Sequence, residues 1–176
     1  MTTAPALERR LRLTVVVHGR PAPQGSKAYK GHRTNAATGR RTAVLVEQSK
    51  RVKPWRALVT TATTTAMTTA HVMQYGGYPM ERPSPLDGPL EADIVFTVLK
   101  PASAPKRRRT WPTTRHSGDI DKLIRSTFDG IADGGAVVDD SRIIRVTATK
   151  AFPGEHPDAL DQPGAIIRLY TLGDPS

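Results

Sequence analysis

The stretch RHSGDIDKLIRSTFDGI, residues 115–131, decides much of the fold, because an apolar helical stripe and a pair of aspartates meet in it. Ile124, Phe128 and Ile131 recur at spacings of three and four residues. This periodicity predicts a helix over residues 121–131 that turns one face toward a core. A helix of this kind needs a second layer to bury its stripe, and the flanking segments must supply that layer.

Five short segments rich in β-branched and apolar residues predict strands. They are residues 11–18, 42–47, 92–99, 142–149 and 165–172. A second helix is expected from Lys53, although seven threonines within residues 60–69 lower its propensity and make it depend on packing. Residues 28–41 are expected to form an exposed basic hairpin or loop. The order of elements predicts an α+β fold, a mixed β-sheet with two main helices packed on it.

Length and composition favour one domain over residues 1–176, since 176 residues can bury a single core. We expect residues 1–10 to be a flexible tail and residues 100–118 to be a long basic loop within the domain. The absence of cysteine excludes disulfides and thiolate metal sites and fits a reducing cytoplasm. Without an apolar run of 18 residues, no membrane partner is expected.

The charge is strongly positive and unevenly placed. The net charge is +10, and residues 1–56 carry 13 basic side chains against 2 acidic ones. Residues 100–125 carry 8 basic and 2 acidic side chains. Clusters of this kind are typical of proteins that bind the phosphate backbone of nucleic acids.

Asp119 and Asp121 allow two interpretations. Aspartate is common at helix N-termini, where it caps free N–H groups and faces the positive end of the helix dipole. A second acidic pair, Asp139 and Asp140, follows the same predicted helix. Carboxylates from several elements are the ligands that Mg²⁺ prefers, and such a metal activates water for phosphodiester hydrolysis. If the aspartates bind a metal, the two acidic pairs are expected to converge on one site.

Several motifs resemble the RusA family of Holliday junction resolvases, in particular its phage and prophage branch. The core of the resemblance is DIDKLIR at 119–125, FDG at 128–130 and VDDSRII at 138–144. The segment VVVHGRPAPQGSK at 15–27, the KPW triplet at 53–55 and Lys150 at the end of a strand also fit. The resemblance spans roughly residues 11–150.

The resemblance implies a crossover junction endodeoxyribonuclease of DNA recombination and repair. Such enzymes are homodimers that depend on Mg²⁺, with Mn²⁺ a plausible substitute, and nick two opposing strands of a four-way junction symmetrically. It implies a cytoplasmic protein of a bacterial or phage-infected cell. The family's metal-binding aspartates fall on Asp119, Asp121 and Asp140, and its essential basic residue falls on Arg125. Arginine stays charged, so Arg125 would stabilise transition-state charge rather than donate a proton.

Three neighbouring residues keep open roles. Asp139 would orient Asp140 or its waters, or simply form a turn. Asp129 is expected to pair with Arg125 at i, i+4 rather than to bind metal. Trp111 would either stack on an unpaired base of the junction or anchor its loop to the core.

Basic side chains around this acidic centre are the candidate DNA contacts. They are Lys27, Lys30, Lys106, Arg107, Arg108, Arg109, Lys122 and Lys150. The alternative function is a non-catalytic basic DNA-binding module in which the aspartates only cap helices. A binder has no need of three acids facing DNA, which favours the nuclease.

Overall fold

A four-stranded mixed sheet forms the centre of the protein, whose computed structural model describes residues 8–25, 27–47, 49–105 and 107–173. Its strands are β1 (Glu8–His18), β4 (Leu90–Thr97), β5 (Ile143–Ala151) and β6 (Gly164–Gly173). The strand order is β1-β6-β4-β5, with β4 and β5 parallel and the other neighbours antiparallel. β1 and β5 are therefore the two edges of this sheet.

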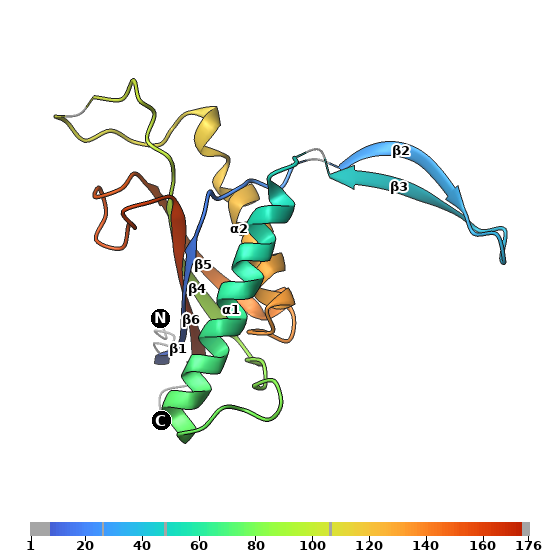
Figure 1. The fold of residues 1–176 in the computed structure, drawn as a ribbon, viewed down its shortest axis with the longest axis horizontal. Helices are drawn as coiled ribbons and strands as arrows, with labels where there is room; N and C mark the ends of the chain where they lie inside the picture. The colour runs from blue at the N-terminus through green and yellow to red at the C-terminus, as the bar shows by residue number, and fades with distance from the viewer. Residues whose placement is uncertain (1–7, 26, 48, 106, 174–176) are drawn as a thin grey trace, which may run out of the picture.

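Two helices cover this sheet, α1 (Val52–Tyr75) and α2 (Ile120–Asp133). α1 packs along β1 and against α2, and α2 connects the parallel strands β4 and β5 (Figure 1). Two parallel strands that follow each other in the chain need such a crossover connection. The crossover makes α2 run antiparallel to β4 and β5. The N-terminus of α2 therefore lies toward the end of β5, and its C-terminus lies toward the start of β5.

The helices meet through small residues and a buried hydrogen bond. A Cβ added at Gly130 would lie 2.7 Å from Val59, so only glycine allows this close approach. The indole N–H of Trp55 donates to the Thr127 hydroxyl at 3.1 Å in the interior. Packing of this kind explains how a helix so rich in threonine is stable.

A two-stranded hairpin leaves the body of the molecule. It consists of β2 (Lys27–Thr34) and β3 (Arg41–Glu47), paired antiparallel. Figure 1 shows it projecting far from the sheet, on the side opposite the loop that precedes α2. The expected exposed basic hairpin is thus present, and both projections arise at the end of the molecule where α2 begins.

The predicted fold class, a mixed sheet with two helices, is confirmed. β1 begins at Glu8, so the last three residues of the expected tail belong to a strand, and residues 1–7 lie outside the described residues. β4 lies two residues earlier than predicted, in register with β5. No helix in the described chain is long and apolar enough to span a membrane.

Candidate active site

Asp119 occupies the N-cap position of α2 but does not cap it. Its backbone is extended, and its carboxylate makes no capping hydrogen bond. Gly118 precedes it with φ at 79°, and a Cβ there would lie 3.1 Å from Pro23. Asp121 follows in the first turn, and both aspartates are exposed. The capping interpretation therefore fails for the Asp119 side chain, whose oxygens point to other partners.

Cations surround Asp119. Lys122 Nζ lies 2.7 Å from its Oδ2. This hydrogen bond and the charge of Lys122 hold the pKa of Asp119 below its ordinary value, and Lys150 and Arg115 lower it further. Asp119 is thus a charged carboxylate at neutral pH, paired with the ammonium of Lys122.

Lys150, near the end of β5, stabilises the turn that precedes Asp119 through two hydrogen bonds. Its Nζ donates to the backbone oxygen of Gly118 at 2.6 Å and to the Ser117 hydroxyl at 3.1 Å. The buried Ser117 hydroxyl donates in turn to the backbone oxygen of Pro112 at 2.6 Å. Burial lowers the pKa of Lys150, and the charge of Asp119 opposes that shift. A residue expected to contact DNA is therefore engaged within the protein.

The second acidic pair lies in the 3-10 turn η2 (Asp140–Arg142), immediately before β5. Asp139 Oδ1 accepts a hydrogen bond from the Ser141 N–H at 2.9 Å, which lowers the pKa of Asp139. Of the two roles left open for Asp139, the structure thus shows the turn-forming one. Asp140 is exposed and has no such bond within the described chain.

Asp139 and Asp140 line a hollow of about 450 Å³ between the first turns of α1 and the last turns of α2. Asp129 and Asp133 line it too, with Lys53 and Arg56. Asp129 pairs with Arg56 of α1, which corrects the expected pairing with Arg125. The correction has a simple cause: helix packing brings Arg56 alongside Asp129, whereas the sequence shows only neighbours on one helix.

The two acidic pairs do not meet within the chain. Asp119 and Asp121 lie beside the end of β5, whereas Asp140 lies before its start. The nine residues of β5 span roughly 30 Å at a rise of about 3.3 Å each. Across residues 8–25, 27–47, 49–105 and 107–173, no three His, Cys, Asp or Glu side chains are grouped so that they could hold a metal. The expected convergence is therefore not met in a single chain.

The donor chemistry at the start of α2 nevertheless suits Mg²⁺. This ion binds through one or two carboxylates, keeps several waters and takes further oxygens from a phosphate. Asp119 and Asp121 offer two exposed carboxylates, and Asp119 is held in its charged form. These two residues could hold such an ion while a DNA phosphate supplied the remaining oxygens.

Basic and aromatic side chains lie in the loop that precedes α2. Arg107, Arg108 and Arg109 are exposed, and Arg109 lies over the Trp111 ring at 4.1 Å while donating to the backbone oxygen of Glu155. Trp111 is 59% exposed, so it does not anchor its loop in the core. Lys106 lies outside the described residues.

Other expected DNA contacts lie apart from this loop. Lys30 is exposed on the hairpin, while the side chain of Lys27 lies outside the described part. Arg125 is exposed one turn below Asp121, and neither forms a salt bridge within the described chain. Lys122, in contrast, is paired with Asp119.

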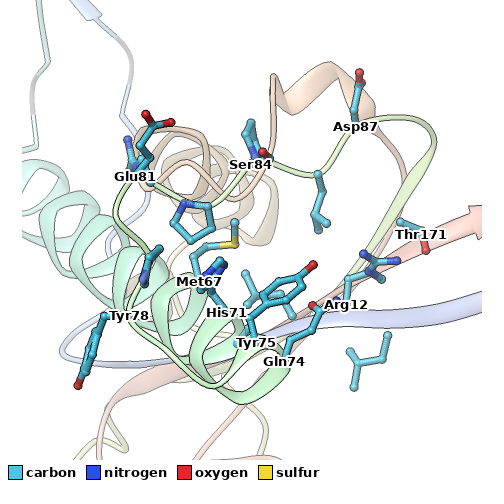
Figure 2. Close-up of a pocket in the computed structure, with 18 of the residues that line it drawn as sticks. Arg12, Met67, His71, Gln74, Tyr75, Tyr78, Glu81, Ser84, Asp87 and Thr171 are labelled. Carbon is cyan, nitrogen blue, oxygen red and sulfur yellow. The ribbon is translucent and has the colours of Figure 1, made fainter.

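A larger hollow, of about 1280 Å³, lies at the opposite end of α1 (Figure 2). Met67, His71 and Tyr75 of α1 face it, with Arg12 of β1 and the loop that contains Glu81. None of the candidate site residues lines it. The candidate site residues therefore lie away from this hollow.

The sequence did not indicate that Ser117 and Gly118 help to position Asp119. A Ser-Gly pair in a loop carries no distinctive signal, because its importance arises from Lys150 and Pro23, which are distant in sequence. Only the fold brings these four residues together.

A family model described as endodeoxyribonuclease RusA matches residues 16–160, which confirms the resemblance drawn from the motifs. No curated protein matches the chain significantly.

Proposed function

Because the chain belongs to the RusA family of endodeoxyribonucleases, we propose that it is a Mg²⁺-dependent nuclease that resolves four-way DNA junctions by paired symmetric nicks. Such an activity serves DNA recombination and repair. One observation supports the proposal. The carboxylates of Asp119 and Asp121 are exposed at the start of α2, cationic side chains lie near Asp119, and the Asp119 carboxylate does not cap the helix. A protein that merely bound DNA would gain nothing from this arrangement.

We propose three metal-binding aspartates, Asp119 and Asp121 at the start of α2 and Asp140 from the second chain of a homodimer, because Asp140 of the same chain lies before the other end of β5. When bound, Mg²⁺, or Mn²⁺ in its place, would activate water and neutralise charge on the scissile phosphate. Arg125 lies four residues after Asp121 on an exposed helix face. Its permanently charged guanidinium would stabilise the charge that develops on the phosphate during cleavage.

Branched DNA would lie across the end of the molecule where α2 begins. The loop with Arg107, Arg108 and Arg109 projects on one side of this end, and the hairpin with Lys30 projects on the other (Figure 1). Contacts of these cations with phosphates would position the DNA without reading its sequence. We propose that the two projections grip separate arms of the junction.

The test is a nicking assay on a synthetic four-way junction, with and without Mg²⁺, together with binding in a chelator. Asp121→Asn should abolish nicking and leave junction binding equal or stronger, because it removes a ligand and a negative charge near the phosphate. Glu81→Gln is the matched control, since Glu81 is an exposed acid beside the hollow at the far end of α1. Full nicking by a folded Asp121→Asn protein would refute the proposal.

A further inference from the structure

The hollow at the C-terminal end of α1 has no role in the proposed nuclease. α1 and α2 run in the same direction where they touch, because a Cβ added at Gly130 would meet Val59 and one added at Gly134 would meet Thr63. α1 then continues beyond Thr63 to Tyr75, away from the start of α2. The hollow of about 1280 Å³ in Figure 2 therefore lies at the far end of the molecule from the candidate active site.

The floor of this hollow is apolar. Leu13 of β1 and Met67 of α1 are buried there, and Ala70 and Leu86 pack against the core beside them. None of these four side chains donates a hydrogen bond, so the floor suits an apolar side chain better than the polar edge of a nucleic-acid base. The volume also exceeds the roughly 300–1,000 Å³ of typical small-molecule sites. Both features indicate a segment of polypeptide as the ligand.

Large apolar side chains are exposed around the same hollow. Leu11 is 51% exposed, Tyr75 67% and Tyr78 84%, and Met80 is fully exposed. Apolar side chains gathered on a surface and rimmed by polar ones mark sites of protein interaction. Tyrosine is enriched among the residues that dominate binding energy, and methionine adapts to different apolar partners. These side chains therefore offer anchors for a protein partner.

Three arginines make the rim of the hollow positive, Arg10 and Arg12 of β1 and Arg82 of the loop before β4. None of them forms a salt bridge within residues 8–25, 27–47, 49–105 and 107–173. Arg82 donates to the Thr64 hydroxyl and to the backbone oxygen of Asp133, which are neutral acceptors. The three guanidinium groups thus keep their charge uncompensated.

The acids of the rim do not balance these arginines. Glu81 and Asp87 line the hollow, but Asp87 is paired with Arg142 at 3.0 Å. Within the described part of the chain, Glu81 is the one acid of the rim without a salt bridge. A guanidinium group binds a carboxylate through two parallel hydrogen bonds. Charge complementarity therefore points to an acidic partner.

We propose that this hollow docks an acidic segment of another protein. A large apolar side chain of that segment lies on the floor, and its carboxylates pair with Arg10, Arg12 and Arg82. None of the candidate site residues lines the hollow, so a partner bound here leaves the DNA surface free. The inference does not depend on the proposed cleavage chemistry.

Selection of short random peptides tests the chemistry of the partner. Peptides displayed on phage are selected on the immobilised full chain in the presence of excess duplex DNA, which occupies the other cationic surfaces. The recovered peptides should combine several acidic residues with a large apolar one. Recovery of basic or purely polar peptides, or of none, would overturn the inference.

Substitutions at the rim test the location. Arg12→Glu and Tyr75→Ala should each lower the affinity of a recovered peptide about tenfold in fluorescence anisotropy, as expected for side chains that anchor an interface. Both side chains are exposed, so the circular dichroism spectrum should not change. Arg51→Glu is the charge-matched control, because Arg51 is exposed at the other end of α1. Equal loss with Arg51→Glu, or no loss with either rim variant, would show that the peptide binds elsewhere.

Other occupants of the hollow would give different results. If a single-stranded oligonucleotide, rather than a peptide, loses affinity in both rim variants, the hollow binds nucleic acid. If either rim variant changes the oligomeric state in light scattering, a second copy of the chain covers the hollow. Either result overturns the inference. Nicking of a four-way junction by the Arg12→Glu protein should match wild type, and its loss would assign the hollow to the DNA site instead.

Discussion

Lys150→Met separates a positioning role from DNA contact at the end of β5. Methionine keeps most of the unbranched stem but removes the ammonium that donates to Gly118 at 2.6 Å and to Ser117 at 3.1 Å. A hydrogen bond to a charged group contributes about 1.5–3 kcal/mol, and a buried acceptor left without a partner costs about 1–3 kcal/mol. Relief of the cost of burying the ammonium, which also lowers the pKa of Lys150, offsets part of this loss. We therefore expect a net loss of about 2 kcal/mol.

Thermal unfolding and nicking measure the two consequences. For a chain of this size, about 2 kcal/mol corresponds to a decrease in Tm of about 4–8 °C. Because the turn before Asp119 loosens, nicking should require more Mg²⁺, while junction binding in a chelator stays as in wild type. Lys50→Met, at an exposed lysine, is the control and should change stability by less than about 0.5 kcal/mol. An unchanged Tm together with weaker junction binding would show that Lys150 contacts DNA and would refute the positioning role.

Three further predictions concern the charges and the exposed ring around the site. The pKa of Asp119 is lowered mainly by Lys122, so the stability that this ion pair contributes is present above the unfolded-state pKa and is lost as the pH falls through the lower folded-state pKa. Lys122→Met should therefore raise the pKa of the Asp119 carboxyl in an NMR titration, and an unchanged pKa would contradict the pairing. Trp111→Ala should weaken junction binding by about 1–3 kcal/mol and spare linear duplex, as expected for stacking on an unpaired base; equal loss on both substrates would exclude stacking. Substitution of residues 106–109 by alanine should reduce the slope of log affinity against log salt concentration by roughly 2–4, because each phosphate contact contributes up to about 0.9 to that slope. A slope unchanged within about 0.5 would show that these cations do not contact phosphate.

The amino-acid sequence by itself determined most of the secondary structure and the family of the protein. The three- and four-residue spacing of Ile124, Phe128 and Ile131 predicts α2 within three residues at each end, because helical periodicity is a local property. Five of the six strands in the described residues follow from runs of β-branched residues for the same reason, whereas β2 was expected only as part of a basic hairpin or loop. The DIDKLIR and VDDSRII motifs indicate the family, which the match over residues 16–160 confirms.

The tertiary structure alone decided which side chains meet. Asp129 pairs with Arg56 of the other helix. Lys150 Nζ donates a hydrogen bond to the backbone oxygen of Gly118, in a turn more than thirty residues earlier in the chain. The position of Asp140 relative to Asp119 also depends on topology, since the crossover between parallel strands sends α2 and β5 in opposite directions. In the sequence these two aspartates lie on either side of one short helix, and this spacing predicts a single site. The directions of α2 and β5 are set by how the helix packs on the sheet, and they separate the two aspartates by the length of a strand.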